Sequence, residues 1–484
     1  MLFNSLDFAI FLPTVFLLYW FVAKKNLKLQ NALIVLASYV FYGWWDWRFL
    51  SLIIFSTVVD YLVGQKLRTE EKQSKRKVLL WTSILVNLGF LGFFKYYNFF
   101  LENFVDAFSL FGTHINNNSL NIILPVGISF YTFQTLSYTI DVYKKKLEPT
   151  QDIIAFSAFV CFFPQLVAGP IERATNLLPQ FYKKRTFEYH KAVDGMRQIL
   201  WGLFKKVVIA DNCAVFVNSI YENFSILSNE ILIIGVFLFS FQIYCDFSAY
   251  SDMAIGIAKL FGIKLSQNFS TPYFSRDIAE FWRRWHISLS TWFRDYLYIP
   301  LGGSRVSKFF QYRNLILVFL VSGLWHGANW TFIFWGLIHV TFYLPQLINK
   351  TNRNYLNIFD NNKTTTIIEY LRIVKTFILV SFAWIFFRSN SIELAINYIK
   401  HIFLNTKISI ENSFFIIDNE INNLLFVTLM IIIMLIIECY NRGKEHGYSR
   451  MPKNIIIRHF SYIITCLLII EYFNGETSFI YFQF

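Results

Sequence analysis

The stretch LILVFLVSGLWHGANWTFIFWGLIHVTFYLPQL, from Leu315 to Leu347, carries no acidic residue, lysine or arginine. One helix needs about 20 apolar residues to cross a bilayer, so this longer stretch predicts a pair of membrane-spanning helices. Trp325, His326 and Gly327 interrupt its apolar character. An ionisable side chain inside a membrane segment is costly and usually faces a cavity or a partner, and histidine exchanges a proton near neutral pH. We therefore expect the function of this chain to involve His326.

The composition of the whole chain agrees with a membrane protein. Its 484 residues are 55% hydrophobic and only 15% charged, whereas soluble domains average about 25% charged residues. Apolar windows recur along the sequence, and they predict an all-α polytopic protein with about 11 or 12 transmembrane helices. The windows are Phe8 to Ala23, Ala32 to Tyr42, Leu50 to Val63, Val78 to Phe94, Asn121 to Ile140, Leu200 to Val217, Ile231 to Tyr250, the pair within Leu315 to Leu347, Ile367 to Phe387, Leu424 to Ile437 and Ile455 to Ile470.

Basic loops suggest an orientation in the membrane. They follow alternate predicted spans, so all of them lie on the same side of the membrane. This pattern predicts that the basic loops are cytoplasmic and that the N-terminus lies outside. The basic loops include Gly64 to Lys77 and Asn441 to Lys453, while Asn116 to Ser119 and Ser409 to Asn422 carry few positive charges. The net charge of +13 is spread over these loops and not gathered in one patch, so no nucleic-acid partner is expected. No loop is long enough for a separate soluble domain, which predicts a single membrane domain over residues 1–484.

The middle of the chain breaks the hydrophobic pattern. TPYFSRDIAEFWRRWHISLSTWFRDYLYIPLGG, from Thr271 to Gly303, has apolar residues at helical spacing and a charged opposite face. This pattern favours one amphipathic helix at the membrane interface, with His286 at the border of its two faces. The arginines of the helix have two open uses: they pair with neighbouring carboxylates, or they bind the phosphates of a cytosolic donor. The residues considered for donor binding are Arg283, Arg284 and Arg294.

Two further stretches carry polar groups within apolar surroundings. In YCDFSAYSDMAIG, Asp246 and Asp252 are six residues apart, so they point roughly 240° apart on a helix and do not share a proton. Ser248 and Asp252, four apart, can face one another. These groups either pair structurally or line a reaction chamber. In FFPQLVAGPIER, from Phe162 to Arg173, prolines and glycine end a helix before it can span, which predicts a re-entrant segment covered by protein or water.

These motifs together carry a resemblance. FFPQLVAGPIER, YCDFSAYSDMAIG, NFSTPYFSRDIAEFWRRWHISLSTWFRDYLYIPLGG, LWHGANWTFIFWG and the ending FIYFQF resemble the bacterial alginate O-acetyltransferase branch of the membrane-bound O-acyltransferase family, over essentially the whole chain. The resemblance implies many helices around a central tunnel, with re-entrant and interfacial helices beside them. It also implies that His326 is the catalytic base and that His286 is a second catalytic histidine.

The chemistry of acyl transfer assigns further expected roles. A base must deprotonate the acceptor hydroxyl, donors must stabilise the oxyanion, and water must be excluded. We expect His326 to supply the base, and His286, Asn329 or a backbone N–H near Gly327 to stabilise the oxyanion. Tryptophans are expected to wall the chamber. These are Trp325, Trp330 and Trp335.

The resemblance also implies the direction of transfer. Acetyl groups would pass from cytosolic acetyl-CoA, a substrate and not a bound cofactor, across the bacterial inner membrane. The acceptor would be a cell-surface polysaccharide such as alginate or peptidoglycan, reached through an extracytoplasmic serine-esterase-like partner. Two alternatives remain open at this point: a D-alanyl transferase for teichoic acids, and a transporter or flippase that uses the intramembrane His and Asp residues as a path.

Overall fold

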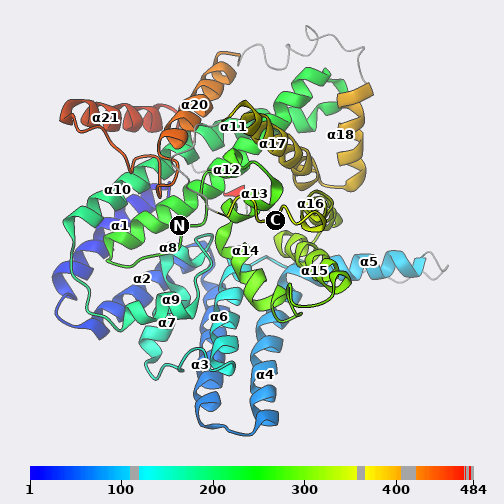
Figure 1. The fold of residues 1–484 in the computed structure, drawn as a ribbon. Helices are drawn as coiled ribbons and strands as arrows, with labels where there is room; N and C mark the ends of the chain where they lie inside the picture. Colours follow the sequence, from blue (N-terminus) through cyan, green and yellow to red (C-terminus); the bar gives the residue numbers. More distant parts are fainter. Residues whose placement is uncertain (110–118, 357–365, 405–420, 474, 476–478, 481–484) are drawn as a thin grey trace. The chain divides into compact units, whose positions relative to one another are not determined.

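A computed structural model of the chain describes residues 1–109, 119–356, 366–404, 421–473, 475 and 479–480. All regular secondary structure in these ranges is helical (Figure 1). The chain divides into two compact units, and each is described here by itself. Unit 1 contains residues 1–195 and 257–266, and unit 2 contains residues 196–256 and 267–484. The predicted outer loops at 116–118 and 409–420, and the end of the chain at 481–484, lie outside the described residues.

Unit 1 holds helices whose polar side chains meet in its interior. Helices α3, α4 and α6 run side by side (Figure 1). Between them the buried Asp60 carboxylate accepts hydrogen bonds from Ser83, from Asn87 at 2.9 Å and from Thr139 at 3.0 Å. Such bonds join helices where apolar surface gives no hydrophobic drive for association. The elements are α1 (Leu6–Leu17), η1 (Leu18–Val22), α2 (Leu27–Asp46), η2 (Trp47–Phe49), α3 (Leu50–Thr69), α4 (Gln73–Leu91), η3 (Gly92–Tyr96), α5 (Tyr97–Ser109), α6 (Ile128–Tyr143), α7 (Ile153–Cys161), α8 (Phe163–Leu166), α9 (Ala174–Leu177), η4 (Leu178–Phe181) and the start of α10 (Tyr189–Leu203).

The broken segment from Phe162 to Arg173 is covered by protein, as its sequence predicts. Helix α7 ends at Cys161, α8 makes a single turn, and the residues that follow are not helical. The side chains from Phe162 to Glu172 are buried. Burial raises the pKa of Glu172 to about 7, and its carboxylate accepts the backbone N–H of Ser266. The non-helical backbone is therefore held inside unit 1, which is the condition for such a segment at membrane depth.

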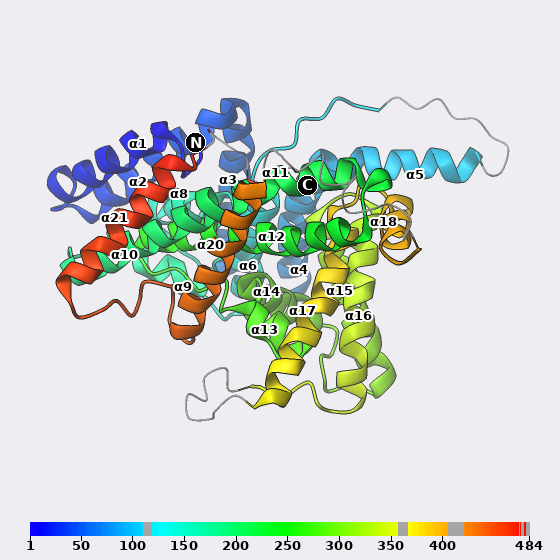
Figure 2. The ribbon, with the colours of Figure 1, turned by 90° about the horizontal axis from the view of Figure 1, so that it is seen from above.

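Unit 2 is built around the long helix α12 and a helical hairpin. Its elements are the end of α10, η5 (Phe204–Ala210), α11 (Asp211–Glu222), η6 (Phe224–Ile226), α12 (Asn229–Leu260), η7 (Pro272–Phe274), α13 (Ile278–Arg284), α14 (Ile287–Phe293), η8 (Arg294–Tyr298), α15 (Lys308–His326), α16 (Trp330–Ile348), α17 (Ile367–Arg388), α18 (Ile392–Leu404), α20 (Ile421–Tyr440) and α21 (Ile455–Glu471). Figure 2 shows α15, α16 and α17 next to one another.

The hairpin confirms that Leu315 to Leu347 contains two helices, and of the two α16 is among those long and apolar enough to cross a membrane, whereas a membrane crossing by α15 stays a prediction. Helices α15 and α16 pack closely because glycines stand at their contact. A Cβ atom on Gly323 would collide with the backbone of Phe332, and one on Gly336 would collide with the backbone of Phe319. Small residues at such positions let two membrane helices approach. His326 is the last residue of α15, so the close packing fixes its position relative to α16.

Six stretches of the described residues are long and apolar enough to cross a membrane. They are Leu27–Thr69, Gln73–Ser109, Asn229–Leu260, Trp330–Ile348, Ile367–Arg388 and Ile421–Tyr440. The first contains two of the predicted windows, Ala32 to Tyr42 and Leu50 to Val63, and the second contains one, Val78 to Phe94. Leu6–Val22 is a shorter apolar helix. The chain is therefore a multi-pass, all-α membrane protein, whereas the predicted count of 11 or 12 spans stays a prediction.

Candidate active site

The chain breaks at His286, and the predicted continuous amphipathic helix is wrong at this point. Helix α13 ends at Arg284, Trp285 is extended, and His286 adopts a left-handed backbone with φ of 43°. This conformation costs a non-glycine residue about 1–2 kcal/mol. Backbone bonds to a neighbouring segment hold the break: the Ile287 N–H donates to the Asn268 carbonyl at 2.9 Å, and the Ser270 N–H donates to the Arg284 carbonyl at 3.0 Å. His286 is consequently fully buried, not exposed at the border of two faces.

The break brings the two predicted histidines together. The ring centroids of His286 and His326 are 6.4 Å apart, and both side chains are buried. Trp325 contacts both rings, with centroids 5.9 Å from His286 and 5.0 Å from His326. The ring centroid of Trp335 lies 5.2 Å from that of His326. A reactive group placed between the histidines would be surrounded by aromatic rings and shielded from water.

The two other predicted wall and oxyanion residues lie differently. The Trp330 side chain is 52% exposed, so its predicted place in the chamber wall is wrong. Asn329 caps helix α16 by accepting the Thr331 N–H at 3.0 Å, and its amide donates to the Asn390 carbonyl at 2.9 Å. Its side chain is thus engaged on both sides.

A cavity of about 650 Å³, named here the wide cavity, adjoins the end of α15. Its size is that of a small-molecule site, because such sites usually range from about 300 to 1,000 Å³. Most of its polar lining consists of amides and hydroxyls, with Lys206, Asp211, Asp246 and Arg388 as the charged members. Its lining also includes Gln242, Gly327, Ala328, Asn329 and Ile480.

Two adjacent lysines of the π-helix η5 hold the two aspartates that the sequence analysis singled out. Lys206 Nζ lies 2.7 Å from Asp246 and 2.7 Å from Asp211, beside the wide cavity. Lys205 Nζ lies 2.7 Å from Asp252 and donates to Ser248 Oγ at 2.7 Å. The predicted separation of the two aspartates is confirmed, and so is the shared face of Ser248 and Asp252.

Lys205 belongs to a second, much smaller cavity, named here the narrow cavity. Its volume of about 30 Å³ leaves room for about one water molecule. Buried Glu438 accepts a hydrogen bond from Tyr244 at 2.7 Å, and both residues line it together with Asn268. The narrow cavity is therefore the smaller of the two, and the charged residues that line it are Lys205, Asp252, Glu438, Lys444 and Glu445.

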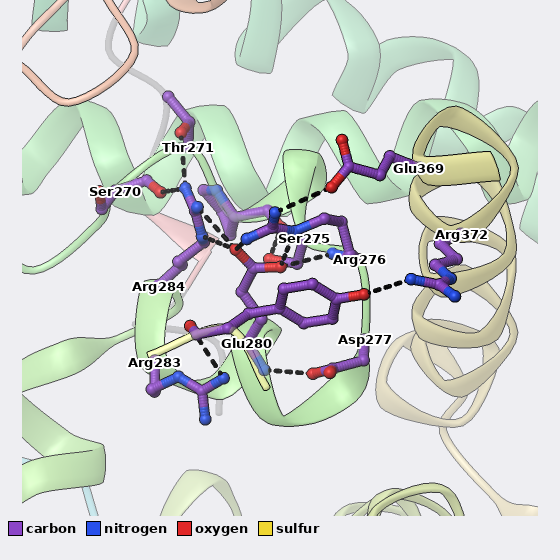
Figure 3. Close-up of polar contacts among 12 residues, drawn as sticks. Ser270, Thr271, Ser275, Arg276, Asp277, Glu280, Arg283, Arg284, Glu369 and Arg372 are labelled. Atoms are coloured by element: carbon purple, nitrogen blue, oxygen red, sulfur yellow. Dashed lines mark hydrogen bonds and ion pairs between the residues drawn. The ribbon is translucent and has the colours of Figure 1, made fainter. Parts of the chain in front are cut away.

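Two arginines of the predicted amphipathic helix pair with a neighbouring carboxylate, which is the first of the two uses considered for them (Figure 3). Glu280 is fully buried and pairs with Arg276 at 3.0 Å and with Arg284 at 2.8 Å. These partners lower the pKa of Glu280 although its burial alone would raise it. Arg284 also donates to Ser270 and Thr271, so its guanidinium group is engaged in this network. The network stabilises the break next to His286.

The other two arginines proposed for donor binding lie nearer the surface. Arg283 donates to the carbonyls of Asn352 at 3.0 Å and Tyr355 at 3.3 Å. Arg294 pairs with its neighbour Asp295 at 2.7 Å, and its side chain is 58% exposed. Of the three, Arg294 is the most exposed.

Sequence reasoning missed four groups at the site. Lys205 and Lys206 lie within the apolar window Leu200 to Val217, where a pair of charges is itself a signal of function or pairing. Glu438 follows an apolar run in the same way. Asn268 gave no signal, since a lone asparagine before a Ser-Thr-Pro turn is an ordinary loop residue.

Two buried histidines thus lie together in a helical membrane protein, and Gly327, the residue after His326, lines a polar cavity. Residues 149–388 match the family model of MBOAT, the membrane-bound O-acyltransferase family.

Relatives match over most of the chain. A peptidoglycan O-acetyltransferase of Helicobacter pylori is 35% identical, over 100% of this chain and 98% of the relative. A probable alginate O-acetylase AlgI of Azotobacter vinelandii is 41% identical, over 82% of this chain and 76% of the relative. A teichoic acid D-alanyltransferase of Bacillus subtilis is 31% identical over 55% of this chain and 69% of the relative. The chain belongs to the membrane-bound O-acyltransferase family and is an acyltransferase of the O-acetyltransferase type, which argues against the transporter alternative.

Proposed function

We propose that this protein passes acetyl groups from cytosolic acetyl-CoA to a cell-envelope polysaccharide outside the inner membrane, through an extracytoplasmic serine-esterase-like partner. The observation that carries the proposal is the pair of buried histidines, whose ring centroids are 6.4 Å apart, with the wide cavity lined by Gly327, the residue after His326. The similarity to a peptidoglycan O-acetyltransferase over both full lengths favours peptidoglycan as the polymer.

In the proposed reaction, the His326 imidazole takes the proton of an acceptor hydroxyl held in the wide cavity. The hydroxyl oxygen attacks the thioester carbonyl, and the C–S bond breaks as the tetrahedral intermediate collapses. The proton then passes from the imidazolium to the leaving thiolate, so the products are an acetyl ester and free CoA. Gly327 and Ala328 line the cavity directly after His326, and their backbone N–H groups are the candidates for stabilising the oxyanion.

Charge supports the proposed sidedness. Helix α15 starts among basic residues, Lys308 and Arg313, and α16 ends before Lys350 and Arg353. Basic residues flank membrane helices mainly on the cytoplasmic side. The hairpin turn with His326 and the wide cavity therefore faces outward, where the acceptor is, whereas Lys444 of the narrow cavity belongs to a basic, cytoplasmic loop.

Donor consumption tests the proposed reaction. Purified protein in lipid is given radiolabelled acetyl-CoA, with and without candidate extracytoplasmic partners, and release of free CoA and labelling of the partner are followed. Release that depends on the partner is expected. Labelling only with a D-alanyl carrier protein as donor would replace the proposal by the D-alanyl transferase alternative.

Accessibility tests the proposed orientation. Single cysteines replace Lys75 and Lys444, on the predicted cytoplasmic side, and Ser391, after α17 on the predicted outer side, in a background without native cysteines. An impermeant thiol reagent added to intact cells should label only position 391, and all three after permeabilisation. Labelling of position 75 in intact cells would invert the topology.

A further inference from the structure

The orientation of one amide next to His286 can be read from its partners. Asn268 Oδ1 lies 3.2 Å from the backbone N–H of Ser288 and 2.8 Å from Ser288 Oγ. A backbone N–H can only donate, so the atom facing it must be the amide oxygen and not the nitrogen. The amide nitrogen points the other way and donates to Ser251 Oγ at 3.2 Å. The amide of Asn268 is thus fixed in one orientation, fully buried.

This orientation determines the protonation of His286. Its Nδ1 lies 3.1 Å from the same Asn268 oxygen. A carbonyl oxygen only accepts, so Nδ1 must carry the proton. Burial lowers the pKa of His286, which lies outside the membrane-spanning helices, to about 3. The ring is therefore neutral near pH 7, and a neutral imidazole protonated at Nδ1 has a bare Nε2.

The remaining nitrogen faces the site without a protein partner. His286 Nε2 is buried and has no hydrogen-bond partner among the described residues. Around the ring lie Phe247 of α12 at 4.6 Å, Phe269, and Trp325 and His326 of α15. An unpartnered buried acceptor next to the second histidine is suited to a hydrogen donated by a reactant.

We propose that Asn268 is a positioning residue, which holds His286 with its proton on Nδ1 and presents Nε2 to the reactants as a hydrogen-bond acceptor. The identity of these reactants rests on the proposed function. It removes His286 from the candidates for stabilising the oxyanion, because an unprotonated nitrogen cannot donate. It also explains the strained backbone of His286, which Asn268 fixes through both its main chain and its side chain.

The titratable and charged groups around the His286 ring determine how a pH experiment on this ring is interpreted. His326 on α15 is the titratable group next to the ring. Beyond Asn268, the narrow cavity holds Lys205, Asp252 and Glu438, and the first two are paired with one another. Arg284 and Glu280 of α13 are also paired. A carboxylate in place of the Asn268 amide would be the new charge in contact with the His286 ring.

The tautomer is measured directly on the wild-type protein. In lipid nanodiscs with ¹⁵N-labelled histidine, the NMR signals of His286 are assigned by their absence in His286→Gln. A protonated Nδ1 and an unprotonated Nε2 are expected at pH 7. A protonated Nε2 would overturn the proposal. This readout needs no substrate, so it stands or fails separately from the proposed acetyl transfer.

Two substitutions test the positioning role in the acetyl-transfer assay. Asn268→Ala should lower kcat about 10- to 100-fold, as loss of an outer partner of a functional histidine commonly does. Asn268→Asp still accepts from Nδ1 and should keep more activity, but its carboxylate stabilises the imidazolium and raises the pKa of His286. The ¹⁵N signals of His286 in this variant should therefore show the imidazolium at a higher pH than in the wild-type protein. Ser290→Ala, whose hydroxyl donates to the Trp285 carbonyl and not to Asn268, is the matched control and should keep the wild-type kcat and the wild-type titration of His286. An unshifted His286 titration in Asn268→Asp would contradict the proposal.

Discussion

The wide and the narrow cavity of unit 2 are built on the same plan but to different sizes. Each has a lysine of η5 paired with an aspartate of α12, and each lies beside one of the two histidines, the wide cavity through Gly327 and the narrow one through Asn268. Their volumes are about 650 and 30 Å³. The difference in volume indicates different roles for the two cavities. The wide cavity has room for a reactant, whereas Asn268 at the narrow cavity fixes the geometry of His286.

The largest expected effect is the loss of His326 on the wide side. His326→Ala should abolish detectable acetyl transfer while the protein stays folded and inserted, because a positioned base contributes about 10²- to 10⁴-fold to the rate. Polysaccharide acetylation is measured in cells that express only this variant at the wild-type level. His459→Ala, an exposed histidine on α21, is the matched control. Normal acetylation with His326→Ala would mean that the wide side does not hold the base.

A smaller loss is expected at His286. His286→Gln places an amide oxygen near the position of Nε2, so a measurable residue of activity should remain. The double variant with His326→Ala should be no worse than His326→Ala alone, since groups that act as one unit are non-additive. Single-turnover rates in reconstituted protein would show this. The reverse ranking, with His286→Gln inactive and His326→Ala partly active, would assign the base to the other histidine.

Substitution of Lys206 at the wide cavity should lower the stability of the protein more than substitution of Lys205 at the narrow cavity. Removing one partner of a buried ion pair typically costs about 3–5 kcal/mol, because the other charge stays buried. Lys206→Met leaves two carboxylates, Asp211 and Asp246, and should lower the unfolding temperature more than Lys205→Met. Adding Asp252→Leu to Lys205→Met should restore most of the loss. Equal effects of the two single substitutions would show that the second carboxylate at Lys206 carries little charge.

The smallest effect is expected at Arg294. Its ion pair with Asp295 is exposed, so Arg294→Ala should change stability by less than about 1 kcal/mol. If Arg294 binds the phosphates of the donor, its removal should raise KM for acetyl-CoA and leave kcat unchanged. Titration of initial rates with acetyl-CoA separates the two constants. An unchanged KM would remove Arg294 from the donor site.

The sequence predicted the parts of the site that an apolar background makes conspicuous. His326 and the aspartates of α12 interrupt hydrophobic runs, so their cost in a membrane marks them. The break at His286 was not predictable in this way, because Trp282, Trp285 and Leu289 continue a helical spacing across it. Backbone bonds to Asn268 and Ser270, which are distant in the sequence, override that local pattern. The same non-local bonds give Asn268 its role, so no local motif could reveal it.

The π-helix η5 also limits how the length of this chain can change. A π-turn holds one more residue per hydrogen-bonded turn than an α-turn, and helix α10 continues through it into α11. Deleting one residue from Phe204–Ala210 would leave a regular helix but rotate everything on one side of the deletion by about 100°. Lys205 and Lys206 could then no longer serve both cavities at once. A one-residue deletion in η5, in a relative or in an engineered variant, would therefore separate one lysine from its aspartate. This would happen even when every residue named at the site is retained.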